Sequence, residues 1–358
     1  MMPEYTPFLK FKQNEISALA EFERYRNKSV VPFFDIPRPK DISESEILDR
    51  IRIGVRQIER HLPDANFYID NFDLDDSINL NGKNQYTYIL QAVSHLNAIP
   101  VVALNRDGSH NPAALTAVQK IGCDVAIRLT IEDIESYKLT KPDLVAIWPL
   151  LIDAKPREIH VIIDFRVIAS DLDKLKDVAV NFVNSLCADF YVDRIVFTGS
   201  SIPPVITAIL STNSSTSIER QEWHLWKKIE ASLSKSILSK SNFGDYGLVS
   251  PEYSDLDLEI WLVQGVAAPK VFYTYDTRYF VVRGGAFKTH PNGYGQYFDI
   301  ADAIVAKPFY RKPAYSFGDK YIYDRSTLTT KRAKRGGSPS SWLKATLSSH
   351  ITFIVDAV

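Results

Sequence analysis

Short apolar runs alternate with amphipathic stretches along most of the chain. The runs are rich in Val, Ile, Phe and Tyr and are bounded by Pro, Asn, Asp or Gly, which is typical of β-strands. They are apolar almost throughout, so they predict strands buried on both faces, as in a parallel sheet. The seven predicted strands are Tyr5–Phe11, Val30–Ile36, Phe67–Phe72, Pro100–Leu104, Val125–Leu129, His160–Phe165 and Arg194–Thr198.

The stretches between these runs carry apolar residues on one helical face. Ile47 and Ile51 begin such a face, and Ser43 stands three residues before Glu46, as in a capping box. Asp171 is a favourable first residue for another helix. The helices predicted in this way are 14–26, 43–61, 85–96, 112–121, 171–186 and 219–233.

An eighth strand is predicted at residues 246–252, where Pro251 would end it. The eight strands start about 34 residues apart, which is the size of one strand plus one helix. Strict alternation favours a closed (β/α)8 barrel of the TIM type, because its crossovers are right-handed and it leaves no sheet edge exposed. The alternative is an open doubly wound sheet, although no glycine-rich phosphate loop follows the first strand.

We expect the barrel to occupy residues 1–265 and residues 266–358 to form an extension integrated with it. In the extension, residues 270–275 and 278–283 predict a β-hairpin, and residues 295–307 predict a helix. The apolar run Ile351–Val355 predicts a closing strand. A basic cluster, Lys331–Arg335, lies in a polar stretch and is interpreted as a solvated loop.

The amino-acid composition mainly excludes certain classes of protein and partner. The 358 residues carry 42 Lys+Arg and 43 Asp+Glu, a net charge of −1, so the overall charge does not indicate a nucleic-acid partner. Two cysteines cannot build a disulfide framework, and no apolar run reaches the ~18–20 residues that cross a bilayer. The first residues lack the plan of a signal peptide. We therefore expect a cytoplasmic protein with no membrane partner.

Polar residues gather at the carboxyl ends of the predicted strands, where barrels of this type carry their active sites. Three strands end in two apolar residues followed by an aspartate, at Asp35, Asp70 and Asp164. Buried carboxylates need a cation or a metal ion beside them. The candidate cations are Lys10, Lys12, Arg128 and Arg166.

These residues allow two interpretations. In the functional one, Lys12, Asp35, Asp70 and Asp164 are catalytic residues that divide acid and base roles or bind a metal ion. In the structural one, they form salt bridges that close the top of the barrel, or the aspartates cap the helices that follow. The residue types alone do not separate the two.

Several strings along the whole chain, in the expected order, resemble those of the phage-associated beta protein family. They are PFLKFKQNE at 7–15, PFFDIP at 32–37, FGDYG at 243–247, FVVRG at 280–284, GYGQY at 293–297, SFGDKYI at 316–322, and Trp342 with HITF at 350–353. Where that family tends to have two adjacent histidines near its end, this chain has Ser349 and His350.

The resemblance implies one integrated domain and a part in phage–host conflict, but no particular reaction. It also implies that the family's recurrent polar positions form one site, with Arg283 and Asp319 reaching over the barrel mouth as a lid. Together with the strand-end cations, the expected substrate-binding residues are Lys10, Arg128, Arg166, Asp245, Arg283 and Asp319.

Two functional hypotheses follow, and the sequence identifies no cofactor. In the first, the protein belongs to a phage-defence or phage–host conflict system and uses its barrel as a recognition or effector scaffold. Its partner would be an operon-encoded effector protein or a phage protein.

In the second hypothesis, the protein is an enzyme acting on a phosphate-containing or nucleotide-like small molecule. Lys12 and Arg166 would bind the anion, and strand-end aspartates would act as bases or Mg²⁺ ligands. A phage structural or accessory protein is a third option.

Overall fold

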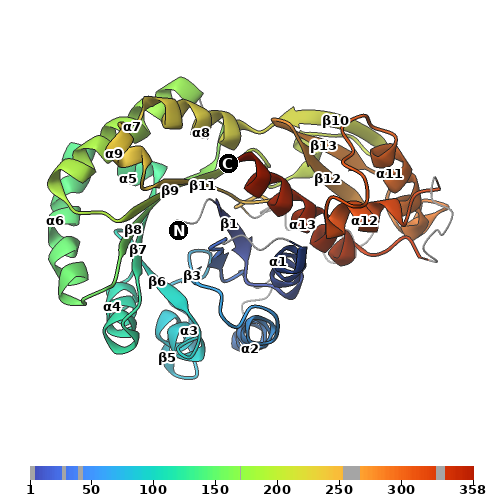
Figure 1. Ribbon diagram of the computed structural model, residues 1–358. Helices are drawn as coiled ribbons and strands as arrows, with labels where there is room; N and C mark the ends of the chain where they lie inside the picture. Colours follow the sequence, from blue (N-terminus) through green and yellow to red (C-terminus); the bar gives the residue numbers. More distant parts are fainter. Residues whose placement is uncertain (1–4, 26–29, 39–42, 170, 253–266, 328–334) are drawn as a thin grey trace. The chain divides into compact units, whose positions relative to one another are not determined.

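The computed structural model describes residues 5–25, 30–38, 43–169, 171–252, 267–327 and 335–358, which divide into two compact units (Figure 1). The first consists of residues 1–16, 29–199 and 221–246, and the second of residues 17–28, 200–220 and 247–358. The predicted division at residue 265 stays a prediction. Residues 331–334 of the basic cluster lie outside the described residues. No helix in the described ranges is long and apolar enough to cross a membrane.

The first unit contains a closed barrel of eight parallel strands alternating with helices, which confirms the predicted (β/α)8 fold. Its strands are β1 (Tyr5–Lys10), β2 (Phe33–Asp35), β3 (Phe67–Asp70), β6 (Ala98–Ala103), β7 (Val125–Thr130), β8 (Ile159–Val167), β9 (Arg194–Ser200) and β11 (Ser241–Asp245). Around the barrel they follow the order β1-β11-β9-β8-β7-β6-β3-β2. The pairing of β11 with β1, in which Tyr5 lies opposite Phe243, closes the ring.

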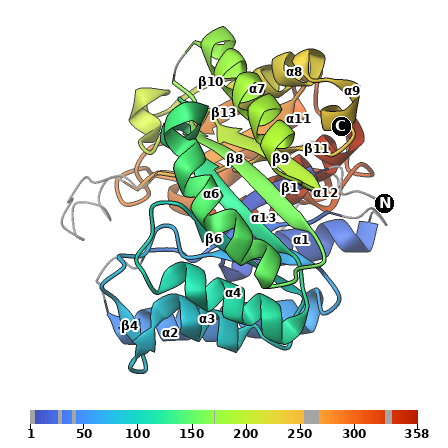
Figure 2. The ribbon, with the colours of Figure 1, turned by 90° about the vertical axis from the view of Figure 1, so that its left-hand side faces the viewer.

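Helices follow the strands and cover the outside of the barrel (Figures 1 and 2). They are α2 (Glu44–His61), α3 (Gln85–Ala92), α4 (His110–Ile121), α5 (Ile131–Ile134), α6 (Tyr137–Asp153), α7 (Leu172–Asp189), α8 (Gln221–Ser232) and α9 (Lys235–Leu238). The helix α1 (Gln13–Tyr25) follows β1, and from residue 17 onward it belongs to the second unit. A two-stranded ribbon, β4 (Asn79–Leu80) with β5 (Lys83–Asn84), precedes α3. Ser43 caps α2 and Asp171 caps α7, as predicted. The sequence did not indicate α6, because Pro142 and Pro149 lie inside it.

Aromatic and aliphatic side chains fill the barrel interior. Phe8, Phe33 and Tyr68, from the neighbouring strands β1, β2 and β3, are all fully buried. The ring centroids of Phe8 and Phe33 lie 4.3 Å apart, and those of Phe33 and Tyr68 lie 5.6 Å apart. Residues from β6, β7, β8 and β9 complete the same apolar cluster. The barrel interior at the level of this apolar cluster is therefore a packed core, as in other barrels of this kind.

The eighth strand lies earlier than predicted. The prediction placed it at 246–252, whereas β11 spans Ser241–Asp245. This strand escaped notice because its sequence, SNFGD, is mostly polar. After it, Gly247 has a φ of 58°, a left-handed conformation that cannot continue a strand. Asp245 therefore ends the strand and does not precede it.

The second unit is built on a three-stranded antiparallel sheet in the order β10-β13-β12. Its elements are η1 (Ile206–Ala208), β10 (Ser214–Glu219), β12 (Lys270–Tyr275), β13 (Arg278–Arg283), η2 (Gly293–Gly295), α11 (Gln296–Val305), α12 (Phe317–Tyr323) and α13 (Pro339–Ala357). The predicted hairpin and the predicted helix after it are confirmed. The sequence did not reveal β10, because its residues, SSTSIE, lack the apolar character of a strand.

The predicted closing strand at Ile351–Val355 is wrong, because these residues belong to α13. Ser338 caps this helix by accepting a hydrogen bond from the Ser341 backbone, and Pro339 stands at its first position. The helix is buried on most sides, so its apolar residues form a continuous run. Such a run does not distinguish a buried helix from a buried strand.

Gly244 in β11 allows the closest approach at the barrel seam. A Cβ at this position would lie 2.7 Å from the backbone oxygen of Thr6, which cannot move without disturbing β1. We expect Gly244→Ala to lower the free energy of unfolding by about 1–3 kcal/mol, a typical cost of overpacking. Urea unfolding measures this change. Gly108→Ala is the matched control, because a Cβ there meets no atom within 4 Å. Equal stability of the two variants would contradict the prediction.

Candidate functional site

One guanidinium group, that of Arg128 on β7, joins several strands at the barrel mouth. Its side chain is 0% exposed. Nε and Nη2 donate hydrogen bonds to Asp164 at 3.0 and 2.7 Å. Nη1 donates to both Asp35 and Asp70 at 2.8 Å, and Nη2 also donates to the Tyr246 hydroxyl at 2.9 Å. All five N–H groups that an arginine offers are therefore bonded.

The strand ends bring these partners together. Asp35 ends β2, Asp70 ends β3, and Asp164 lies near the end of β8. Lys10, Asp35 and Asp70 stand directly opposite one another across β1, β2 and β3. The Lys10 ammonium lies 3.7 Å from Asp35. The sequence thus predicted correctly that these strand-end charges converge.

A second set of ion pairs surrounds the first. Nη2 of Arg106 donates to both carboxylate oxygens of Asp70 at 2.9 Å. Asp73 accepts a hydrogen bond from Lys10, and its carboxylate lies 3.7 Å from Arg166. Four aspartates are thus matched by four cations. We call these eight residues, with Tyr246 and Phe72, the mouth network.

The Phe72 ring is the apolar member of the network. The guanidinium carbons of Arg128, Arg166 and Arg106 lie 4.3, 4.6 and 5.0 Å from its centroid. Such distances allow cation–π attraction, which holds the three like charges around one ring.

Burial and pairing act against each other on the ionisable groups of the network. Burial raises the pKa of Asp35, although Arg128 and Lys10 oppose the shift. Burial also acts to raise the pKa of Asp70, but the charges of Arg106 and Arg128 outweigh it and the pKa is lowered. Burial opposes the charge of Arg128, yet the surrounding aspartates hold its pKa well above the usual value. Arg128 therefore stays a cation.

Arg166 occupies a strained position beside this network. Its φ of 54° lies in the left-handed region, which costs a non-glycine residue about 1–3 kcal/mol. The backbone N–H of Arg166 donates to Asp164 at 2.9 Å, which helps to hold this conformation. Its side chain is 17% exposed, compared with 0% for Arg128. Arg166 is therefore presented towards solvent while Arg128 is sealed inside.

The aspartates of the network do not fit a divalent metal ion in this arrangement. Mg²⁺ needs carboxylate oxygens that are free to approach it at about 2.1 Å. Here Asp35, Asp70 and Asp164 all share Arg128, whose charge would repel a metal ion placed among them.

Lys12 lies just beyond β1 and is exposed, so it is not a buried member of the network. Loss of surrounding water nevertheless lowers the pKa of its ammonium, with Arg50 and Lys10 contributing and Glu15 opposing. Glu15 itself is 3% exposed and accepts a hydrogen bond from the Lys10 backbone at 2.5 Å. Burial raises the pKa of Glu15 to about 7, against the charge of Lys12.

Two other predicted binding residues, Asp245 and Arg283, form hydrogen bonds with residues that are not members of the mouth network. Asp245, at the end of β11, accepts a hydrogen bond from the Tyr5 hydroxyl at 2.7 Å. Arg283, in the second unit, donates to the Leu210 carbonyl at 2.8 Å. The predicted lid over the barrel mouth stays a prediction.

Asp319 is also in the second unit, at the start of α12, and is 0% exposed. It accepts hydrogen bonds from Tyr273, Ser316 and Ser349 at 2.6, 2.5 and 2.7 Å. Its carboxylate therefore ties α12 to β12 and α13.

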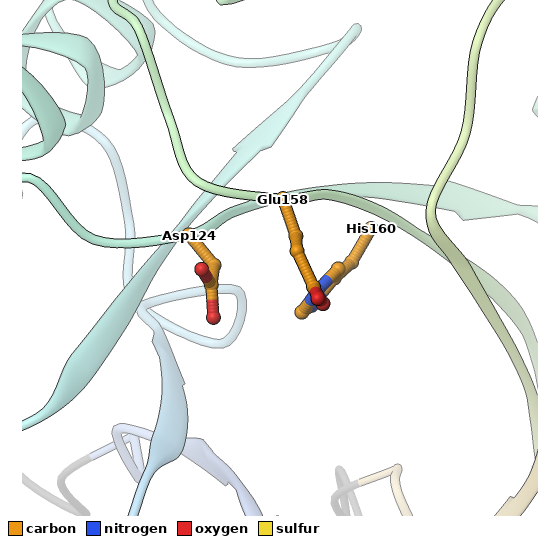
Figure 3. A group of neighbouring side chains, drawn as sticks. All are labelled: Asp124, Glu158 and His160. Atoms are coloured by element: carbon orange, nitrogen blue, oxygen red, sulfur yellow. The ribbon is translucent and has the colours of Figure 1, made fainter. Parts of the chain in front are cut away.

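A separate cluster stands at the amino ends of β7 and β8, where Asp124, Glu158 and His160 place donor atoms within 4.8 Å of one another (Figure 3). This spacing would suit a metal ion. However, both ring nitrogens of His160 are already bonded, to the Tyr68 hydroxyl at 2.8 Å and to Glu158 at 2.9 Å. Burial lowers the pKa of His160. His160 is thus satisfied by hydrogen bonds, and Asp124 pairs with Arg157 at 3.4 Å, as expected at the end of a barrel that usually serves stability.

Four members of the network, Phe72, Asp73, Arg106 and Tyr246, are not among the site residues predicted from the sequence. Arg106 follows β6 in a loop, where its position relative to Asp70 could not be foreseen. Phe72 was assigned to the tail of a strand, and Tyr246 was placed inside the misplaced eighth strand. The string FGDYG, which contains Tyr246, was the available signal for that residue.

Replacing Arg128 should destabilise the barrel strongly. Arg128→Met keeps the length of the side chain but leaves three buried aspartates without their shared cation, which should cost about 3–5 kcal/mol. This loss in the free energy of unfolding should be smaller at acid pH, because protonated aspartates need no cation. Urea unfolding at several pH values measures both effects. Arg157→Met is the control, since that side chain is 66% exposed. A loss in Arg128→Met no larger than in the control would contradict this account.

Glu15 should make stability fall as the pH rises. The unfolded carboxyl releases its proton near 4.5, but the folded one keeps it until about 7. Across this window the folded state binds more protons, so the free energy of unfolding should decrease by on the order of 3 kcal/mol. Glu15→Gln should remove this contribution, as measured by urea midpoints from pH 4.5 to 7. Glu132→Gln, at an exposed position, should leave it intact. If Glu15→Gln and the unchanged protein gave parallel curves, the assignment would be wrong.

The chain was also expected to resemble a known family. The sequence model of the Beta protein family matches residues 5–356. No curated protein matches the chain. Among solved structures, it is similar to a mandelate racemase/muconate lactonizing protein from Paracoccus denitrificans, crystallised in complex with magnesium. The identity is 11% and the TM-score 0.36, over 71% of this chain and 59% of that one. The chain thus spans less than two thirds of that protein, and a similarity this low says nothing about a reaction.

The family match, by contrast, extends over nearly the whole length and includes both units. The strings at the two ends of the sequence, from PFLKFKQNE to HITF, fall inside it. The protein is therefore a member of the Beta protein family.

Proposed function

We propose that this protein is a recognition component of a phage–host conflict system, and that the barrel mouth binds an anionic group of a phage product. One observation carries the proposal: each of the four aspartates in the mouth network is already held by a cation. A general base needs a lone pair that can reach the substrate's proton. The side chains of the four aspartates are at most 5% exposed, so a substrate would not readily reach their oxygens, and the network is better suited to binding than to chemistry.

The outer side of the network supplies the binding groups. Arg166 is 17% exposed, and Lys10 and Arg106 are 8% and 7% exposed. Lys12 adds an exposed positive charge nearby, and the half-buried Phe72 ring adds a flat apolar surface. Arginine recognises phosphate and carboxylate groups with paired hydrogen bonds. An anion would therefore find cations that are oriented before it arrives.

The proposed role in phage–host conflict rests on the resemblance to phage-associated family members. A recognition protein of this kind would act in the cytoplasm, where phage products accumulate. It would pass its signal to an effector protein encoded in the same operon, or bind a phage protein directly.

The enzyme alternative has one specific observation in its favour. Of the four aspartates, Asp73 has the longest distance to an arginine, with 3.7 Å between its carboxylate and the Arg166 guanidinium. A phosphate-containing substrate that drew Arg166 away would leave Asp73 bound to Lys10 alone. Asp73 could then accept a proton. Turnover of such a substrate, lost in Asp73→Asn, would favour this alternative.

Arg166→Gln tests the recognition role. Loss of one charge-assisted contact, about 1.5–3 kcal/mol, should weaken binding of the anionic ligand by at least about tenfold. We expect cells carrying the native locus to resist phage, and cells with Arg166→Gln to lose most of that resistance. The measurement is the efficiency of phage plating, with folding of each variant checked by circular dichroism.

Arg157→Gln is the matched control, because it removes an exposed arginine from the same unit. It should protect as well as the unchanged protein. Full protection by Arg166→Gln would show that the mouth is not the recognition site. Failure of the unchanged locus to protect against any phage would remove the defence role.

A further inference from the structure

The second unit holds a cavity of its own, of about 270 Å³, which the barrel does not share. It lies where β10 begins and β13 ends, beside the first turn of α11. Its polar lining includes Asn213, Ser215, Arg283, His290, Gln296 and Asp299. Two of the strings noted in the sequence, FVVRG and GYGQY, meet here, and the function proposed above uses neither of them.

A buried glutamine holds the walls of this cavity in place. Gln296 is 3% exposed, and its Oε1 accepts a hydrogen bond from the Gly285 N–H at 2.7 Å. Its Nε2 donates to the carbonyls of Gly285 and Gly293 at 3.1 and 2.9 Å. A Cβ on Gly284 would lie 2.4 Å from Gln296 Oε1, so this approach requires glycine. The cavity is therefore pre-formed.

Arg283 is the one cation among the cavity's lining residues, and a second cation, Lys270, lies next to it in the sheet. Lys270 on β12 stands directly opposite Arg283 on β13. Like charges facing each other across paired strands destabilise a sheet. Among the described residues, no carboxylate lies within ion-pair distance of either side chain. Arg283 uses Nη1 for the Leu210 carbonyl, and burial together with the charge of Arg283 lowers the pKa of Lys270.

Neutral polar groups lie close to this charge. Asn213 has a φ of 53°, a left-handed conformation that asparagine tolerates better than most residues. A Cβ on Gly285 would lie 3.0 Å from both Asn213 Oδ1 and His290 Cδ2, so these two side chains flank the same glycine. Asp299, in the first turn of α11, adds an acceptor at the cavity wall.

We propose that this cavity binds a small phosphate ester, with its phosphate on Arg283 and Lys270. A phosphate monoester carries a charge of about −1.5 to −2 at neutral pH, which matches the two cations. Asn213 and His290 would contact the rest of the molecule, and Asp299 would accept a hydrogen bond from one of its hydroxyl groups. The cavity volume of about 270 Å³ lies just below the usual range for small-molecule sites, about 300–1,000 Å³, so the ligand must be small.

Calorimetric titration of the full chain tests this, with inorganic phosphate, adenosine 5′-monophosphate and acetate as probes at constant ionic strength. We expect both phosphate probes to bind more tightly than acetate. Tighter binding of the nucleotide than of inorganic phosphate would show that the organic body also contributes. Equal binding of all three probes, or binding of none, would overturn the proposal.

Arg283→Gln should weaken phosphate binding at least about tenfold. Arg278→Gln is the matched control, because Arg278 lies at the other end of the same strand, is 52% exposed and pairs with Glu219. It should bind as the unchanged protein does. Lys270→Gln, at the first residue of β12, provides a second variant, and it too should bind more weakly.

Arg166→Gln separates this inference from the function proposed for the barrel. If phosphate binds in the second unit, Arg166→Gln keeps the phosphate binding that Arg283→Gln removes, and any loss in Arg166→Gln is limited to binding at the barrel mouth. If Arg166→Gln abolishes binding while Arg283→Gln does not, phosphate binds at the barrel mouth and the second-unit site is wrong. Loss of phage protection in Arg166→Gln would bear on the barrel alone.

Discussion

The barrel depends on the satisfaction of one buried charge. Arg128 extends from β7 into the mouth and has no access to water, so its five N–H groups must all find acceptors within the protein. Asp35, Asp70, Asp164 and Tyr246 provide them, and they come from four different parts of the ring. An apolar layer of the same volume is often as stable as a buried ionic network or more stable. What the network does is constrain which strand ends lie together, because each acceptor of Arg128 must reach the same guanidinium.

This constraint also decides what the mouth can do. Since Arg128 holds the inner carboxylates, the groups left facing outward are mainly cations and one aromatic ring. The function proposed above assigns anion binding to these outer groups. Arg166, whose backbone is strained, is the most accessible cation of the network, with 17% of its side chain exposed. In the second unit, a pre-formed cavity likewise has an arginine, Arg283, in its lining.

Much of the barrel could be predicted because strands buried on both faces leave a distinct apolar signature. The convergence of Asp35, Asp70 and Asp164 followed from their positions at strand ends. Catalytic roles for these residues and for Lys12 stay predictions. The elements that were not predicted correctly each have a local reason. The strands β11 and β10 are polar in sequence, and α6 contains two prolines. The helix α13 is too buried to show one apolar face. Arg106 could not be foreseen, since a loop residue is placed by the fold rather than by its neighbours in sequence.

The way the sheet of the second unit is assembled has a practical consequence for dividing the protein. Six residue pairs join β10 to β13, from Ser214 opposite Arg283 to Glu219 opposite Arg278. More than fifty residues of chain separate the two strands. A fragment beginning after residue 265 would keep the hairpin but lose β10, so one edge of β13 would have no partner. Unpaired edges of this kind invite aggregation. Shortened versions of the protein would therefore be expected to precipitate even though the excised region looks continuous in sequence.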